Sequence, residues 1–134
     1  MSGKLSPAML EAILETLPLE MTVIDENDRI VWWNARRPRI FPRPDGVLGM
    51  DVRSCHLPES NRMIDRLLDE MKTGGRDVVR MWFDRSGESG AQQKLLIEYI
   101  AVRDAAGRYL GCIETLQDVL PLGALEGERK TLDG

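Results

Sequence analysis

The sequence predicts a single α+β domain: a five-stranded antiparallel sheet with helices on one face and an amphipathic helix before the first strand. Two observations lead to this fold class. The chain has 134 residues, which is enough for one hydrophobic core and too few for two. Its strand-like segments form a run of two and a run of three with a helical block between them, an order typical of α+β domains.

Residues 1–17 are expected to form the amphipathic helix. Ser6 can accept hydrogen bonds from the free amides of the first turn, and Pro7 suits the first helical position. Apolar residues then recur at helical spacing: Met9, Leu10, Ile13, Leu14 and Leu17. This apolar stripe has to be covered, either by the domain's own sheet or by a second copy of the chain.

The main domain is expected over residues 18–119, beginning with a strand pair. Segments 21–24 and 29–33 are rich in β-branched and aromatic residues, and the acidic stretch between them has turn chemistry. The polar segment 34–49 is interrupted by prolines, so a helix there extends for at most a turn or two.

A longer helix is predicted over residues 59–72, because one face carries an apolar stripe of Met63, Ile64, Leu67, Leu68 and Met71. Gly74 and Gly75 end it. Three strands are expected next, at 77–84, 94–103 and 108–117, with a Gly/Ser-rich loop after the first. Residues 120–134 contain proline and several glycines, and we expect a short flexible tail.

Composition excludes several classes of protein. The chain carries 18 basic and 22 acidic residues, a net charge of −4, which disfavours a general nucleic-acid binder. No apolar run reaches the roughly 18 residues that span a bilayer, and the N-terminus lacks the apolar core of a signal peptide. Two cysteines make no disulfide framework. These features predict a cytoplasmic protein with no nucleic-acid or membrane partner.

Four segments carry a resemblance to a known family. They are residues 23–34 (VIDENDRIVWWN), 47–52 (VLGMDV), 56–60 (HLPES) and 102–111 (VRDAAGRYLG), the last leading to QDV at 117–119. In this order and spacing they resemble the PAS domain, a sensory and dimerisation module. The resemblance implies the PAS fold and a ligand pocket between the inner face of the sheet and the long helix.

Within PAS domains, the chain resembles a bacterial and archaeal subgroup often fused to hemerythrin-like domains. The similar segments are IFPR at 40–43, the Cys55-His56 pair, GRDV at 75–78 and AVRD at 101–104. The sequence departs from this subgroup at Leu57, where a second proline is usual. It has no hemerythrin-like part, and a single histidine cannot build a di-iron site in this chain.

The residues that we expect to line the PAS pocket are Met63, Ile64 and Leu67 from the helix, with Met81, Phe83, Ile97 and Tyr99 from the strands. Such a lining suits an apolar or flat molecule with one or two polar anchors. The same residues would equally form a filled core, and both alternatives stay open.

His56 is the only histidine, so two hypotheses apply to it. It is either an axial haem ligand, as in some PAS domains, or a residue that holds backbone groups at the start of the long helix. A flavin is less expected, because the cysteine motif of flavin photosensors is absent. Cys55 would be redox-active only as an exposed thiol of low pKa, and it points away from its neighbour His56. Buried Cys112 is expected to act as a small apolar residue.

Arginines 36, 37, 39 and 43 lie close together in the proline-containing segment. They can hold a carboxylate or phosphate, or they form a solvated loop that neutralises Asp45 and Asp51. Arg43, inside the IFPR motif, is the first candidate for an anion contact.

These observations predict a non-catalytic sensor or interaction module that responds to a small ligand or to redox state. A homodimer is expected through residues 5–17 and the outer face of the sheet, or a protein effector in trans. The signal would be read out at the N-terminal helix or near Asp118. Two rival hypotheses are a small redox-active protein that uses Cys55 and a dimerisation module without a ligand.

Overall fold

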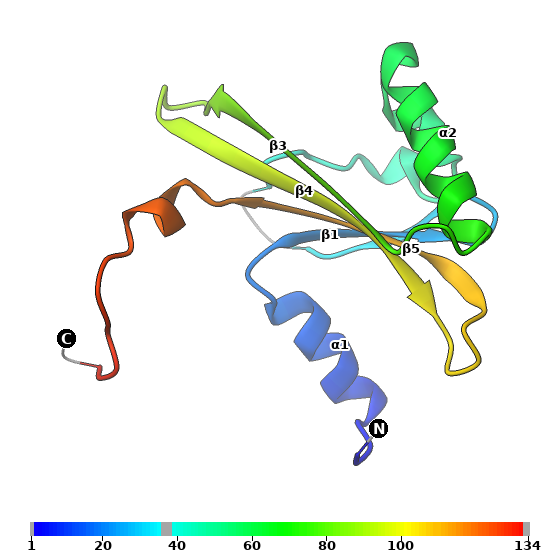
Figure 1. Ribbon diagram of the computed structural model, residues 1–134, viewed down its shortest axis with the longest axis horizontal. Helices are drawn as coiled ribbons and strands as arrows, with labels where there is room; N and C mark the ends of the chain where they lie inside the picture. The colour runs from blue at the N-terminus through cyan, green and yellow to red at the C-terminus, as the bar shows by residue number, and fades with distance from the viewer. Residues whose placement is uncertain (1, 36–38, 133–134) are drawn as a thin grey trace.

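The computed structural model describes residues 2–35 and 39–132 and contains one five-stranded antiparallel sheet, so the predicted fold class is confirmed. The strand order is β2-β1-β5-β4-β3 (Figure 1). The elements in chain order are α1 (Pro7–Thr16), β1 (Glu20–Asp25), β2 (Ile30–Trp33), η1 (Asp45–Val47), η2 (Val52–Cys55), α2 (Pro58–Lys72), β3 (Val78–Ser86), β4 (Gln92–Arg103), β5 (Tyr109–Asp118) and η3 (Leu120–Ala124).

Alternation along the strands gives the sheet two distinct faces. On the inner face, Ile24 of β1 lies opposite Cys112 of β5, and Cys112 lies opposite Ala101 of β4. The same register places Glu114 of β5 and Tyr99 of β4 side by side on this face. The apolar members of the inner face pack against α2, which covers it (Figure 1).

The core lies between α2 and the inner face of β1, β5 and β4. The predicted stripe of α2 supplies four buried residues, Ile64, Leu67, Leu68 and Met71. The helix is fixed at its C-terminal end by polar contacts, because Lys72 Nζ lies 2.8 Å from a carboxylate oxygen of Asp28 and Arg103 Nη2 donates to the Met71 carbonyl at 2.5 Å. Buried apolar area and these two contacts together hold α2 on the sheet.

Gly111 allows β1 and β5 to approach closely. Its φ is +156°, and a Cβ atom built there would collide with the backbone carbonyl oxygen of Ile24. Any other residue would push the two strands apart at this point of the ladder.

Helix α1 forms as predicted, with Ser6 Oγ accepting a hydrogen bond from the Met9 amide at 3.1 Å. It projects on the side of the sheet opposite α2 (Figure 1), and none of its residues is buried. Met9 and Leu10 are about half exposed. The first alternative for the apolar stripe, packing on the domain's own sheet, is therefore wrong.

The C-terminal segment and the β3–β4 turn differ slightly from the prediction. Both strands extend further than expected, so the turn shortens to residues 87–91. Only η3 is regular in the tail, and the rest has no helix or strand up to residue 132. No helix in the described parts of the chain is long and apolar enough to cross a membrane.

Candidate functional site

A cavity of about 410 Å³ opens between the N-terminal end of α2 and the inner face of β3, β4 and β5. Its lining residues are His56, Glu59, Ser60, Met63, Met81, Phe83, Ile97, Tyr99 and Glu114. The volume lies within the range of about 300–1,000 Å³ typical of small-molecule sites.

Most of the residues predicted for the pocket lie around this cavity. His56, Met63, Met81, Phe83, Ile97 and Tyr99 line it. Ile64 and Leu67 do not, because their side chains turn into the core and are almost fully buried. The filled core and the cavity therefore coexist at the two ends of α2.

Sequence analysis missed three lining residues, Glu59, Ser60 and Glu114. A signal for Glu114 existed, since it alternates with Cys112 and Leu116, both of which are buried on the inner face. The period of two predicts an inward side chain, but a glutamate is rarely placed there without a visible cationic partner.

That partner is Arg43. Its Nη2 lies 2.7 Å from Glu114 Oε1, and its Nε donates to Thr22 Oγ1 at 3.3 Å. Both charged side chains are close to fully buried, at 12% and 8% exposed. The anion contacted by Arg43 is thus a carboxylate of the protein itself.

The segment around Arg43 is held across the inner face; we call residues 39–43 the strap. Glu20, buried at the start of β1, accepts hydrogen bonds from the Ile40 amide at 2.6 Å and the Phe41 amide at 3.1 Å. Arg39 Nη1 donates to Asn34 Oδ1 at 2.9 Å. The interpretation of these arginines as a solvated loop facing Asp45 and Asp51 is therefore wrong for Arg39 and Arg43. Arg36 and Arg37, the other two arginines of that hypothesis, lie outside the described residues.

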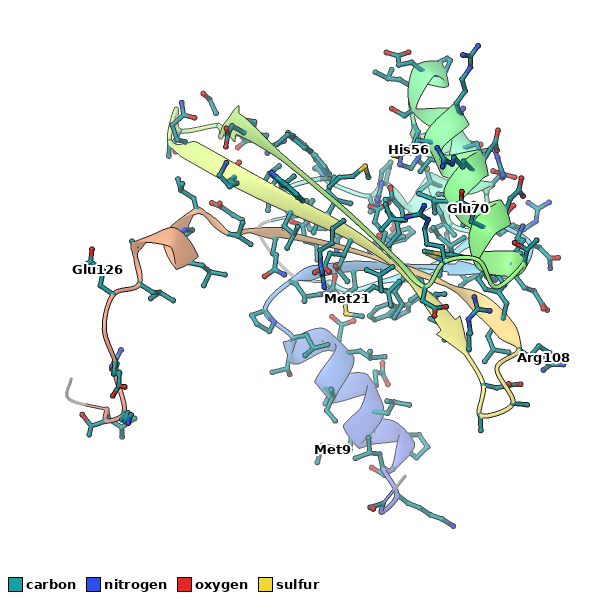
Figure 2. All side chains as sticks on the ribbon, in the orientation of Figure 1. Met9, Met21, His56, Glu70, Arg108 and Glu126 are labelled. Atoms are coloured by element: carbon teal, nitrogen blue, oxygen red, sulfur yellow. The ribbon has the colours of Figure 1, made fainter. Side chains whose placement is uncertain are left out.

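His56 lies beside α2, where Figure 2 labels it. Its Nδ1 donates to the Val52 carbonyl at 2.9 Å, because a carbonyl oxygen can only accept. This contact is the backbone role that one hypothesis gave to His56. The remaining nitrogen, Nε2, lies 3.9 Å from Glu114 Oε2.

This geometry does not fit haem. Nε2 is the only ring nitrogen of His56 left for a metal, and an iron bound to it at about 2 Å would be crowded by the Glu114 carboxylate 3.9 Å from that nitrogen. Across the described residues, no three His, Cys, Asp or Glu side chains gather closely enough to hold a metal ion.

Tyr99 also lines the cavity, and it lies beside Glu114 on the inner face of the sheet. Burial raises the pKa of Tyr99, and the charge of Glu114, together with a hydrogen bond between the two side chains, raises it further. The hydroxyl therefore stays protonated and serves Glu114 as a donor.

The two cysteines differ in exposure, but burial shifts the pKa of both thiols in the same direction. Burial raises the pKa of Cys55, and it raises the pKa of Cys112 to about 12. A raised pKa disfavours the reactive thiolate at neutral pH. This observation counts against the redox hypothesis for Cys55, while Cys112 is the buried apolar residue that the sequence predicted.

Comparison with known proteins decides the family. A family profile described as "PAS domain" matches residues 10–120. The chain belongs to the PAS domain family. No sequence among the curated proteins matches it.

Solved structures place this PAS domain among relatives. The C-terminal domain of a Streptococcus mutans protein is 32% identical, with 94% of each chain covered and a TM-score of 0.83. The PAS domain of a Colwellia psychrerythraea protein is 12% identical, with 85% of this chain and 97% of that one covered and a TM-score of 0.60. A sensory box sensor histidine kinase from Vibrio cholerae is 16% identical, with 84% and 90% covered and a TM-score of 0.55. The two lower identities speak for the fold alone, and none of these matches supports the hemerythrin-fused subgroup.

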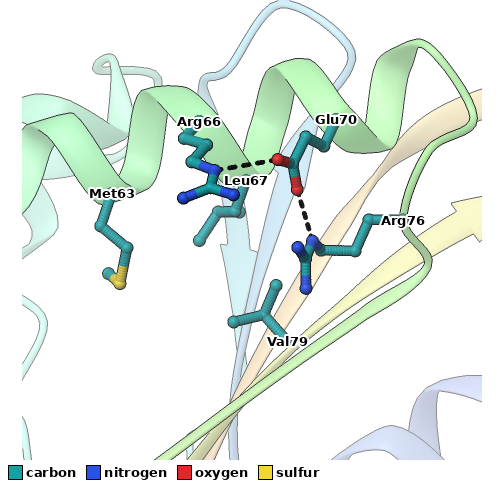
Figure 3. A pocket seen from close by; sticks show the side chains of 6 residues that line it. All are labelled: Met63, Arg66, Leu67, Glu70, Arg76 and Val79. Atoms are coloured by element: carbon teal, nitrogen blue, oxygen red, sulfur yellow. Dashed lines mark hydrogen bonds and ion pairs between the residues drawn. The ribbon is translucent and has the colours of Figure 1, made fainter.

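A second, smaller depression of about 180 Å³ lies between α2 and β3 of this PAS domain (Figure 3). Glu70 lies there between two arginines, 2.9 Å from Arg66 Nε and 2.5 Å from Arg76 Nε. The Arg76 hydrogen bond, with that of Arg66, lowers the pKa of Glu70. These side chains are open to solvent, so we regard the cluster as a surface ion pair network.

Proposed function

We propose that this PAS domain is a non-catalytic sensory module that binds a small molecule in the cavity between α2 and the sheet. One observation carries the proposal: a mostly apolar cavity of about 410 Å³ is lined by Glu114, a buried carboxylate that is paired with Arg43 behind it. A cavity with a few convergent polar groups is the usual form of a small-molecule site.

The strap gives this site a physical connection to the N-terminal helix. Glu114 contacts Arg43 at one end of the strap, and the amides of the other end bond to Glu20, three residues after Leu17 at the end of α1. A molecule that changes the Glu114–Arg43 contact can therefore shift the strap and bias α1. A measurement at both ends of the strap tests this coupling.

Homodimerisation is the readout that we propose for α1. A groove of about 400 Å³ runs along its apolar side, lined by Met9, Ala12, Ile13, Thr16, Leu17 and Pro18. The outer face of the sheet exposes further apolar groups, among them Trp82 at 65%. Both surfaces lie on the side away from α2, and a second copy of the chain would cover both. A protein effector in trans is the alternative occupant.

Freshly purified protein tests the small-molecule role. Native mass spectrometry with an absorbance spectrum should reveal a bound organic molecule of small mass and no haem band. Identical masses before and after denaturation, together with no response to the small apolar probes used below, would contradict the proposal.

Sedimentation tests the dimer. Ile13→Glu, on the exposed stripe of α1, should lower the average mass toward the monomer, whereas Glu11→Gln on the same helix should not. An unchanged dimer in Ile13→Glu would remove α1 from the interface.

Cytoplasmic location and membership of the hemerythrin-fused subgroup stay predictions from the sequence.

A further inference from the structure

The polar atoms that the cavity offers to a bound molecule are mainly hydrogen-bond acceptors. Glu114 accepts hydrogen bonds from Arg43 at Oε1 and from Tyr99, and because a carboxylate has about four acceptor positions, acceptor capacity remains beside the cavity. His56 uses its Nδ1 proton on the Val52 carbonyl, so in the neutral form of the ring Nε2 is an acceptor. Glu59 adds a second carboxylate at the rim. None of the nine lining residues is a lysine or an arginine.

Two of these acceptors are close neighbours. His56 Nε2 and Glu114 Oε2 lie 3.9 Å apart, and both side chains are mostly buried, at 19% and 8% exposed. Two lone pairs that face one another are unfavourable unless a donor lies between or beside them. Tyr99 donates to Glu114, and Nε2 of the neutral His56 ring can accept a second donor. An N–H group that enters this corner would satisfy either or both.

An anionic molecule meets the opposite situation. Its carboxylate would approach Glu114 and Glu59, while Arg43 already has its Nη2 on Glu114 and its Nε on Thr22. Like charges in a partly buried site repel one another strongly. The ion pair thus occupies two donor groups of Arg43 that could otherwise have received an acid.

The remaining walls of the cavity favour a bound molecule whose main part is apolar. Met63, Met81, Phe83 and Ile97 supply them. Methionine side chains adapt to the shape of their neighbour and make favourable contacts with aromatic rings. A single ring with a short substituent would fill this space and reach the polar corner.

We propose that the cavity takes a small apolar or aromatic molecule that carries an N–H donor, recognised by Glu114 Oε2 and His56 Nε2, and that it rejects carboxylic acids. This inference rests on the proposed small-molecule function, which it makes more specific.

Three probes of similar size test the selectivity: benzylamine, toluene and benzoate. Each is titrated into the full chain while the methyl resonances of Met63 and Met81 are followed by NMR. Benzylamine should bind about tenfold or more tightly than toluene, the gain expected of a hydrogen bond to a charged group. Benzoate should bind more weakly than toluene.

A pair of double variants identifies the groups responsible. Arg43→Leu/Glu114→Leu removes the acceptor together with its counter-ion, so no buried charge is left alone. It should lower the affinity for benzylamine toward that of toluene, leaving only the part of the preference that His56 Nε2 supplies. The matched control is Arg80→Leu/Glu98→Leu, which removes another arginine–glutamate pair, also 2.7 Å apart, from the outer face of the sheet. The control should keep the preference for benzylamine.

Two further variants keep the test decisive if the inner double variant does not fold. His56→Phe removes the Nε2 acceptor and should lower the preference for benzylamine several-fold. Met63→Trp fills the cavity and should abolish the binding of every probe.

The outcomes separate the two proposals. If toluene binds as tightly as benzylamine, or benzoate binds best, the N–H inference is overturned while the small-molecule function stands. If no probe binds, or Met63→Trp binds all of them unchanged, the proposed function fails and the inference fails with it.

Discussion

The two ends of the inner sheet face are packed with opposite kinds of side chain. Under the C-terminal half of α2, the face meets Ile64, Leu68 and Met71 in a filled apolar core. Under the strap, the same face carries two buried glutamates, Glu20 and Glu114, each held by an arginine of the strap or by its amides. The cavity lies next to the charged end.

This difference separates the residues that stabilise the fold from the residues that form the candidate binding site. We call the face under the C-terminal half of α2 the apolar end and the face under the strap the charged end. Apolar burial contributes stability in proportion to area. A buried ion pair contributes little net stability, because the cost of removing both charges from water offsets their attraction. The charged end is therefore better explained by function, since it keeps Glu114 Oε2 beside the cavity, where a purely apolar face would have none.

Breaking the buried Arg43–Glu114 ion pair should give the largest loss of stability. Arg43→Leu leaves the Glu114 carboxylate buried without a counter-ion and should lower the free energy of unfolding by about 3–5 kcal/mol. Arg43→Leu/Glu114→Leu should recover most of that loss. Urea denaturation measures both, and a double variant no more stable than the single one would contradict the account of the pair.

A substitution at the apolar end should give the second-largest loss of stability. Leu68 is fully buried against the sheet, and Leu68→Ala should cost about 2–5 kcal/mol through lost burial and the cavity that it creates. No second substitution should rescue it in the way that Glu114→Leu rescues Arg43→Leu. Binding of toluene, followed through the Met63 and Met81 methyls, should stay within a factor of two of the parent chain, in contrast to Met63→Trp. A large loss of binding in Leu68→Ala would show that the two ends are not separate.

Alkaline pH should weaken the apolar end through Cys112. Burial raises the pKa of this thiol to about 12, whereas in the unfolded chain it ionises near about 8.5. The unfolded state therefore loses its proton first, and the stability that is present below about pH 8.5 is lost as the pH rises toward 12.

By about pH 10 this loss should reach roughly 2 kcal/mol. Urea denaturation between about pH 7 and pH 10 measures it. Cys112→Ala should flatten the pH dependence, and Cys55→Ala, at a less buried thiol, serves as the matched control. An equally steep curve in Cys112→Ala would assign the effect to other groups.

The apolar end is also the part that the sequence predicts best. Helical spacing places Ile64 and Leu68 on one stripe of α2, and alternation places Cys112 inward on β5; both patterns are local. The charged end depends on partners far apart in the chain, since Arg43 and Glu114 are 71 residues apart. Periodicity can orient Glu114, but it cannot name the arginine that neutralises it.

The apolar stripe of α1 likewise shows that sequence periodicity predicts an element but not its distant contacts. Spacing predicts the helix and its apolar side, and Ser6 and Pro7 predict its start, all as observed. What covers the stripe is a matter of tertiary or quaternary contact, and of the two alternatives that the sequence left open, packing on the domain's own sheet is the one that the structure contradicts. Likewise, Ile64 and Leu67 belong to the predicted lining by face but lie too deep in the core to reach the cavity.

The smallest effect on stability is expected at Glu70, whose ion pairs of 2.9 and 2.5 Å are similar in length to the buried pair but have arginine partners exposed to solvent. Since its arginine partners lower the pKa of Glu70, any stability it contributes is present above the pKa of an ordinary glutamate and is lost as the pH falls through the lowered value. Water and salt screen such a pair. Glu70→Gln should therefore shift the urea midpoint less than any variant above, and about 0.5 M NaCl should erase the shift. If Glu70→Gln cost as much as Arg43→Leu, burial would not be what distinguishes the two ion pairs, and the contrast between the ends of the inner face would lose its physical basis.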